Sequence, residues 1–218
     1  MSGIEKICVI GAGVMGAGIA AHAANAGAAV VLLDVVPDAA RMAIAKMQKT
    51  DPAPFMHAKT AKRITPGTTA DDLELIKDCD WIIEAIIERP EIKQELYKSL
   101  APLMKLDAVL SSNTSTLPLK VLTDGMADDL KRRFMITHFF NPPRYMRLLE
   151  IVSSRETDAA VVKRISAFAD EAMGKSVVEA KDTPGFIANR IGTFWLHAAV
   201  TQAIAQGIGV EEADAVLG

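Results

Sequence analysis

The stretch ICVIGAGVMGAGIAAHAANAGAAVVLLD, residues 7–34, decides the fold. It opens with the short, β-rich apolar run 7–10, which ends at a glycine as a buried strand does. An Ala-rich helix is expected over residues 14–26, with Gly27 as its stop, followed by a second buried strand over residues 30–33. A strand, a helix and a strand within about 30 residues form the βαβ unit of a parallel sheet. Because the apolar stretch is divided into a strand, a helix and a second strand, it argues against a signal peptide or a membrane span.

The turn between that strand and helix matches the pattern G-x-G-x-x-G. Gly11 permits the tight turn, Gly13 lets backbone amides approach a pyrophosphate, and Gly16 lets the helix pack close to the strand. Asp34 ends the next strand, 21 residues after Gly13, where a carboxylate binds the ribose hydroxyls of NAD and repels the 2′-phosphate of NADP. A plain structural turn is the alternative reading. We expect NAD as the cofactor, bound by Gly11, Gly13, Val14, Met15, Gly16 and Asp34.

Strands and helices continue to alternate along the rest of the chain. This alternation predicts an α/β fold with a Rossmann-type doubly wound, mostly parallel sheet. Further strands are expected near 64 and over 80–84, 108–111, 134–138, 148–152 and 176–180, and helices over 37–49, from 90 onward, and over 158–173, 186–207 and 211–217. In the helix that Pro90 opens, an apolar stripe is expected from Ile92, Leu96, Leu100 and Leu103.

The 218 residues are expected to form two units. Residues 1–185 would be the NAD-binding domain, and residues 186–218 a long exit helix and the start of a helical domain. We expect the last strand, 176–180, and the long helix after it to lead out of the sheet and to lie outside its core.

Composition limits the class of ligand. With 24 basic and 27 acidic residues the net charge is −3, which argues against nucleic acid or a membrane surface as a partner. Cys8 and Cys79 lie in apolar surroundings and lack the spacing of a metal site, so we expect two buried free thiols and no bound metal. A cytoplasmic protein is the expectation that follows.

Polar residues that could carry chemistry occur at four places. The runs 111–116 (SSNTST) and 138–142 (HFFNP) directly follow predicted strands, Glu150 lies within an apolar strand, and 182–190 (DTPGFIANR) precedes the long helix. In open α/β sheets ligands bind beyond the carboxyl ends of the strands, so the first two runs are expected at the site.

These pieces carry a family resemblance that covers essentially the whole chain. The segments GAGVMGAGIA, IIEAIIERPEIK, SSNTST, HFFNPP, RLLEIV and KDTPGFIANR together resemble the L-3-hydroxyacyl-CoA dehydrogenases of fatty-acid β-oxidation. The resemblance implies NAD-dependent oxidation of an L-3-hydroxyacyl-CoA to a 3-oxoacyl-CoA. The segment PRYMR, residues 143–147, makes the chain similar to the larger bacterial enzymes, some of which also carry a hydratase-like part.

The resemblance also implies residue roles. His138 would be the base that takes the hydroxyl proton, Glu150 would orient its ring, and Ser115 and Asn189 would bind the substrate oxygen. An imidazole suits this work because its unperturbed pKa of about 6.5 is near working pH. Cofactor contacts would come from Glu88, Lys93, Asn141 and Ser115, with Lys93 also facing the CoA side. Taken singly these residues have plain readings: a structural histidine, a solvent-facing glutamate, a helix-capping serine, a surface asparagine and a solvated lysine.

The chain departs from the family in segment 46–69, which is shorter and richer in proline than in the mitochondrial-type enzymes, where a helical hairpin grips the CoA. Lys59, Lys62 and Arg63 either meet a CoA phosphate here or belong to an ordinary solvated loop. The family also continues beyond residue 218 with a helical domain that closes over the acyl chain and forms the dimer contact. We therefore expect a homodimer at full length, and a fragment with low or no activity of its own that self-associates through its last long helix.

Two other functions use the same motifs. A dehydrogenase acting on a sugar acid or on another 3-hydroxy acid without CoA would keep the glycine turn and the His–Glu pair. A non-catalytic NAD-binding module would keep the fold and lose turnover, although the set Ser115, His138, Glu150 and Asn189 argues against it.

Overall fold

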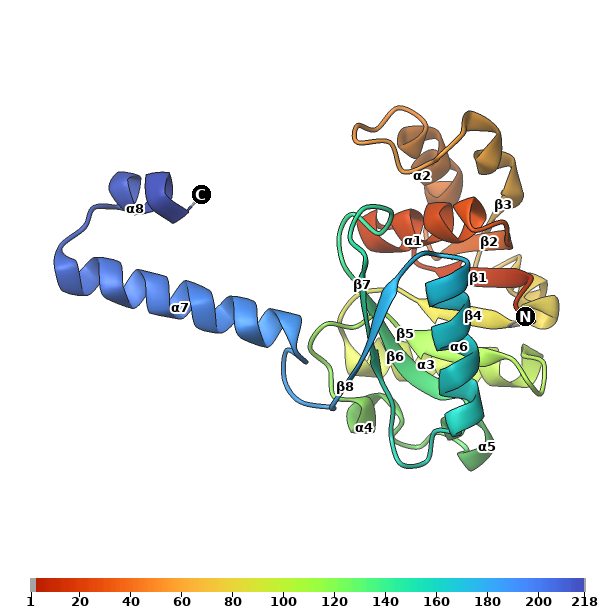
Figure 1. The fold of residues 1–218 in the computed structure, drawn as a ribbon. Coiled ribbons are helices and arrows are strands. Elements are labelled where there is room, and N and C mark those ends of the chain that lie inside the picture. Colours follow the sequence, from red (N-terminus) through yellow and green to blue (C-terminus); the bar gives the residue numbers. More distant parts are fainter. Residues whose placement is uncertain (1–2, 218) are drawn as a thin grey trace.

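The computed structural model describes residues 3–217, so residues 1, 2 and 218 of the expected units lie outside it. Its centre is one eight-stranded sheet in the order β3-β2-β1-β4-β5-β6-β7-β8 (Figure 1). All neighbouring strands are parallel except β6 and β7, which are antiparallel. The strands are β1 (Lys6–Ile10), β2 (Ala29–Asp34), β3 (Ile64–Thr68), β4 (Trp81–Glu84), β5 (Val109–Ser112), β6 (Phe134–Phe139), β7 (Leu148–Val152) and β8 (Ser176–Ala180).

The predicted βαβ unit is confirmed at the middle of this sheet. β1 and β2 pair in parallel, and helix α1 (Val14–Asn25) crosses between them. The order reverses at β1, because β2 lies on one side of it and β4 on the other. A ligand of a doubly wound sheet binds at such a reversal, beyond the carboxyl ends of the strands.

Helices cover both faces of the sheet, and each face has its own apolar core. One core lies under α1, α2 (Ala39–Met47) and α6 (Ala159–Glu171), and Cys8 and Cys79 belong to the other, under α3 (Pro90–Leu100), α4 (Leu119–Leu122) and α5 (Asp128–Lys131). Both thiols are free and buried, as expected. After β8 come helices α7 (Ala188–Gln206) and α8 (Val210–Leu217), and the 3₁₀ turns are η1 (Ala58–Arg63), η2 (Leu73–Asp78) and η3 (Ala101–Leu103).

The expectation that the last strand leads out of the sheet is wrong, although no residue of this strand is buried in the core, as expected. β8 pairs with β7 in parallel over five residues, from Leu148↔Ser176 to Val152↔Ala180. It is an edge strand with mostly exposed side chains, so its sequence lacks the continuous apolar run that marks an inner strand. The chain leaves the sheet only after β8.

The long helix starts two residues later than expected. Phe186 adopts a left-handed φ of 47°, which ends the preceding turn, and α7 begins at Ala188. From there α7 projects away from the sheet, and past its far end the chain turns back into α8 (Figure 1). None of the described residues of α7 is buried. Across residues 3–217, no helix combines the length and apolar character that crossing a membrane requires.

Candidate active site

The glycine turn has the shape that a pyrophosphate requires. A Cβ on Gly11 would lie 2.5 Å from the carbonyl oxygen of Ala85, and a Cβ on Gly16 would lie 1.8 Å from that of Gly11. A Cβ on Gly13 would meet nothing within 4 Å, so this residue faces open space at the start of α1. No described side chain caps this helix. Its first amides and its dipole are therefore available to an anion, and the residues present fit NAD.

Asp34 lies beside this turn and also supports it. One carboxylate oxygen accepts a hydrogen bond of 2.7 Å from the amide of Ala12, and the other accepts one of 2.9 Å from the amide of Val36. The carboxylate thus ties the end of β2 to the glycine turn. Its remaining acceptor positions suit two ribose hydroxyls, the role that the sequence predicts for it.

His138 and Glu150 form a buried pair on neighbouring strands. They are direct partners in the antiparallel register of β6 and β7, which places both side chains on the same face. Nδ1 of His138 lies 2.8 Å from Oε2 of Glu150, with side-chain exposures of 7% and 1%. Because the ionised carboxylate accepts a hydrogen bond from Nδ1–H, the other ring nitrogen, Nε2, is the one that can act on a substrate.

Glu150 also holds the start of the long helix. Its second oxygen, Oε1, accepts hydrogen bonds from the amides of Ile187 (3.0 Å) and Ala188 (2.8 Å). The ring of Phe186 packs edge-on against His138, with ring centres 5.6 Å apart. Asn189 is the next residue of α7 and is half-buried, so these contacts bring it close to the His138–Glu150 pair.

Ser115 lies on a loop that Glu88 organises. Oε1 of Glu88 accepts hydrogen bonds from the Thr114 hydroxyl (2.6 Å) and from the Ser115 amide (3.0 Å). Burial alone would raise the pKa of the Glu88 carboxyl, but the Thr114 hydroxyl, the charge of Lys93 and the Ser115 amide together lower it. The same loop reaches the strand that carries His138, because the Asn113 side-chain oxygen accepts a 2.9 Å bond from the amide of Phe139, the next residue.

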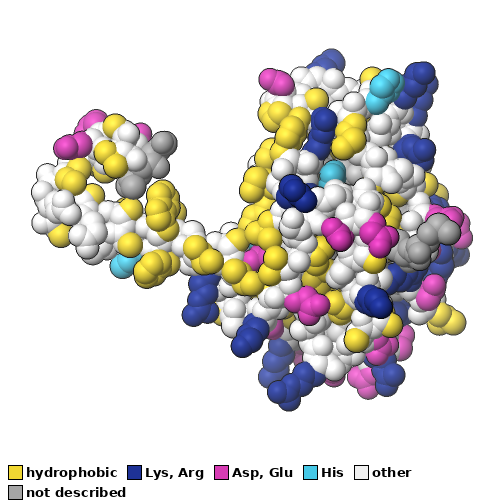
Figure 2. Space-filling model, in the orientation of Figure 1, with side chains coloured by type: hydrophobic (Ala, Val, Ile, Leu, Met, Phe, Trp, Pro, Cys, Tyr) yellow, Lys and Arg dark blue, Asp and Glu magenta, His cyan; other side chains and the backbone are white. Residues whose placement is uncertain are grey.

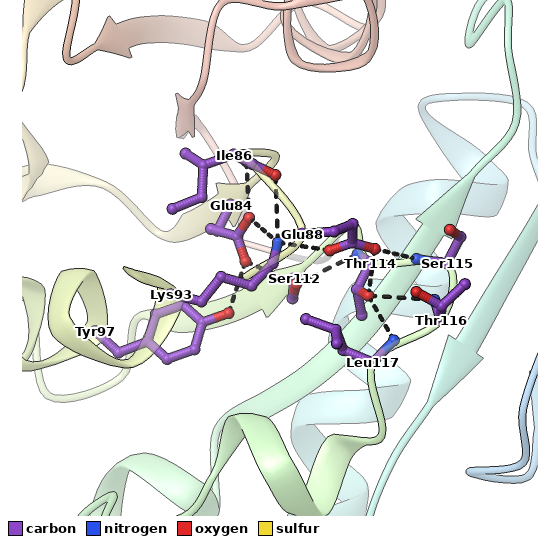
Figure 3. A network of polar contacts seen from close by, with 10 residues as sticks. All are labelled: Glu84, Ile86, Glu88, Lys93, Tyr97, Ser112, Thr114, Ser115, Thr116 and Leu117. Carbon is purple, nitrogen blue, oxygen red and sulfur yellow. Dashed lines mark hydrogen bonds and ion pairs between the residues drawn. The ribbon is translucent and has the colours of Figure 1, made fainter. Parts of the chain in front are cut away.

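Lys93 is buried, although its position on a helix gave no sign of this. Its side chain is 1% exposed, and its ammonium lies 2.5 Å from Oε1 of Glu84 and 3.1 Å from Oε2 of Glu88 (Figure 3). A third bond, of 3.4 Å, goes to the carbonyl oxygen of Ile86. These three partners occupy the three donors of the ammonium group. Lys93 therefore lies beneath the site and not at its surface.

Asn141 begins a loop that is fixed on several sides. Lys175 is buried and donates to the carbonyl oxygens of Pro143 and Met146, and burial lowers its pKa to about 8. Arg144 donates to the carbonyl oxygens of Ala53 and Phe55, which joins this loop to the proline-rich segment.

A groove of about 680 Å³ lies between this loop, α1 and α2. Its wall includes Gly13, Val14 and Asn141, so the groove adjoins the glycine turn. Of the three basic residues expected near a CoA phosphate, Arg63 has a structural role. Its guanidinium donates a 2.8 Å bond to the carbonyl oxygen of Gly27, at the end of α1. Lys59 and Lys62 are exposed on η1.

Sequence reasoning gave no role to several residues that shape the site. Several of them lie within quoted segments, but their contacts join different elements, so the segments alone do not reveal what each side chain touches. Glu84 could have been noticed, because it ends an apolar strand within a segment of the family resemblance. The residues are Glu84, Tyr97, Ser112, Asn113, Arg144 and Lys175.

A doubly wound sheet with an open glycine turn and an acid at the end of β2 defines an NAD-binding Rossmann domain of the oxidoreductase class. The family model described as "3-hydroxyacyl-CoA dehydrogenase, NAD binding domain" matches residues 6–183. The chain belongs to this family.

Relatives agree with this assignment. A Rickettsia felis protein named as a fatty acid oxidation complex trifunctional enzyme is 46% identical over 220 residues, which cover 98% of this chain and 31% of the relative. A Deinococcus radiodurans protein named as a 3-hydroxyacyl-CoA dehydrogenase is 44% identical over 222 residues, which cover 99% of this chain and 64% of the relative. The crystal structure of 3-hydroxybutyryl-CoA dehydrogenase from Escherichia coli K12 superimposes with a TM-score of 0.83 at 31% identity, over 94% of this chain and 44% of that one. The chain thus spans from about a third to two thirds of the length of these curated relatives.

Proposed function

We propose that this chain carries the NAD site and the catalytic base of an enzyme that oxidises an L-3-hydroxyacyl-CoA to the 3-oxoacyl-CoA. The observation that supports this most is the buried contact of 2.8 Å between His138 and Glu150. This contact orients the ring so that Nε2 is the nitrogen left to accept a proton. His138 lies near the carboxyl end of β6, and β6 neighbours β5, after which comes the loop that carries Ser115.

The chain's own residues divide the work as follows. Nε2 of His138 takes the proton of the substrate hydroxyl, and the carboxylate of Glu150 balances the charge of the imidazolium that forms. Ser115 and Asn189 donate hydrogen bonds to the substrate oxygen and hold its carbon in place. When bound, NAD supplies the acceptor for the hydride. The groove beside Asn141 has room for the remainder of an extended thioester.

Replacing the base tests this proposal. His138→Gln is expected to lower turnover of 3-hydroxybutyryl-CoA by about 10²- to 10⁴-fold, the contribution typical of general base catalysis. The Kd of NADH, followed by its fluorescence, is expected to stay within about twofold because Nε2 acts on the substrate. Turnover is measured on the protein in its longest natural form.

His197→Gln is the matched control. His197 is an exposed histidine of α7, so its replacement is expected to change neither turnover nor NADH binding. Equal losses of turnover and of NADH affinity in His138→Gln would contradict the assignment of the base. Turnover of free 3-hydroxy acids in preference to the CoA thioester would contradict the substrate class.

A further inference from the structure

Beneath the loop that carries Ser115 lies a charged network in the interior of the protein (Figure 3). Its centre is Glu84, the last residue of β4, whose side chain is 0% exposed. Oε1 of Glu84 accepts from Lys93 (2.5 Å) and from the amide of Ile86 (2.8 Å). Oε2 accepts from the hydroxyls of Tyr97 (2.6 Å) and Ser112 (2.7 Å). Each oxygen of the carboxylate therefore has two donors, all of them from the described residues of the chain itself.

From Glu84 the contacts lead step by step to the surface. Lys93 is shared between Glu84 and Glu88, and Glu88 is 39% exposed at the rim of the site. Glu88 in turn accepts from the Thr114 hydroxyl and the Ser115 amide. A buried ion pair costs desolvation energy and is weak support for stability alone. Because these contacts run from the core to the loop that carries Ser115, they can fix the position of that loop at the site.

Strand order indicates which part of the cofactor the loop meets. Asp34 at the end of β2 lies on one side of the glycine turn, and the ends of β4, β5 and β6 lie on the other. A dinucleotide spans this point, with the ribose of its adenosine at Asp34. Its nicotinamide end then extends toward the loop after β5 and toward His138. The loop 113–115 is held from below by Glu88 and joined to Phe139 by Asn113.

We propose that Glu84 is a positioning residue: through Lys93 and Glu88 it fixes loop 113–115, against which the nicotinamide end of NAD lies. Lys93 is part of the same network of contacts. It acts on the cofactor through Glu88 and not by its own charge. This inference deepens the proposed function, because it rests on the placement of Ser115 beside the reactive end of NAD.

The test compares NADH with ADP-ribose, which lacks the nicotinamide. Glu84→Gln keeps the shape of the side chain and removes its charge. Lys93 then shifts toward Glu88, and this shift disturbs loop 113–115. The Kd of NADH is expected to rise about tenfold, as metal affinity falls when a residue that hydrogen-bonds to a metal ligand is removed. The Kd of ADP-ribose, measured by calorimetry, is expected to change less than about twofold, because its contacts lie at Asp34 and the glycine turn.

Two variants complete the set. Tyr97→Phe removes one hydrogen bond from Glu84 and keeps the ring, so it is expected to fold. The ratio of the Kd of NADH to the Kd of ADP-ribose is expected to rise, by less than in Glu84→Gln. Glu95→Gln is the matched control, since Glu95 is an exposed carboxylate on α3 paired only with Lys98 among the described residues, and the ratio is expected to stay unchanged. Melting curves confirm that each variant is folded.

Several outcomes would overturn the inference. One is an unchanged ratio in folded Glu84→Gln, or in Tyr97→Phe where Glu84→Gln does not fold. Another is equal weakening of both ligands. A third is a ratio that changes in Lys93→Arg and stays constant in Glu84→Gln, which would assign a direct contact to Lys93. Since no thioester is present, a failure to oxidise 3-hydroxyacyl-CoA would contradict the proposed function and leave this measurement intact.

Discussion

His22 is buried in α1, between the sheet and the segment before β8. Nε2 of its ring lies 3.0 Å from the carbonyl oxygen of Met173, and Nδ1 has no hydrogen-bond partner within residues 3–217. Burial, with the charge of Lys175, lowers the pKa of His22 to about 4, although the bond to Met173 raises it. The fold therefore favours the neutral imidazole over the charged one.

This pKa predicts a specific loss of stability in acid. The neutral ring contributes fully above the unfolded pKa of about 6.5, and its contribution declines as the pH falls toward the folded pKa of about 4. Between pH 7 and pH 5 the wild type should lose about 2 kcal/mol more than His22→Gln, which keeps a donor for Met173. Urea unfolding of both proteins at the two pH values measures this difference. A difference in free energy of unfolding that stays constant with pH would contradict it.

Asp34 is expected to affect cofactor binding more than catalysis. Asp34→Ala removes the acceptor for the ribose and the tie to Ala12, and the Kd of NADH should rise about 10- to 100-fold, as expected for losing a charged hydrogen bond. Turnover at saturating NAD should stay near the wild-type value, the reverse of the His138→Gln pattern. Fluorescence titration and steady-state kinetics separate the two effects. A fall in turnover at saturation with unchanged affinity would refute the role of Asp34.

Single residues were predictable where a local motif fixes their place. The glycine turn and Asp34 follow from spacing within one βαβ unit, and the structure forms that unit. Glu150 was ambiguous, because strand alternation allows it to face solvent, and only the register with His138 shows that it is buried. Contacts such as Arg144 to Ala53, which lie 91 residues apart, have no local signal. The cofactor and catalytic roles of the site residues stay predictions.

At the scale of elements, two glycines at the start of α1 have different roles: Gly16 allows the helix to pack, and Gly13 leaves room for a ligand. Gly16→Ala would force its Cβ into the carbonyl oxygen of Gly11, so α1 must move away from β1. The expected cost is about 1–3 kcal/mol of stability, as for other overpacked sites, together with loss of NADH binding. Gly13→Ala meets open space and should keep wild-type stability, but its methyl group occupies the path of the pyrophosphate and weakens NADH binding.

Thermal melts and NADH titrations of this glycine pair check the prediction. Loss of stability in Gly13→Ala, or normal NADH binding in Gly16→Ala, would show that the turn works differently.

Most elements follow from the sequence, because apolar runs ending at glycine, proline or a polar residue mark inner strands clearly. The face of α3 does not follow so simply. Ile92, expected in its apolar stripe, is 39% exposed, and Lys93 takes the inner position with Tyr97 and Leu100. Apolar periodicity cannot reveal an inward-facing charge whose partner lies on another element. Helices α4 and α5 have four residues each, too few for a periodic pattern.

At the scale of the whole molecule, apolar side chains along α7 are exposed (Figure 2). Phe194 is 75%, Trp195 50% and Ile204 75% exposed. A patch of this kind promotes association. We expect this chain to form dimers or larger species at high concentration, as seen by sedimentation. The division of the chain at residue 185 stays a prediction.

Phe194→Ser with Ile204→Ser should shift the chain toward monomer. Because α7 has no buried residue among those described, the sheet should melt at the wild-type temperature. A monomeric wild type at high concentration, or association unchanged in the double variant, would contradict this role of α7.

The two contacts of Glu150 link the position of α7 to that of the His138 ring. One oxygen orients the imidazole while the other receives the two amides that start α7. A displacement of α7 that withdrew those amides would leave the ring of His138 as the one remaining partner of this carboxylate among the described residues, and the carboxylate could then turn. The orientation of this imidazole therefore depends on where α7 begins as well as on the pairing of the two strands.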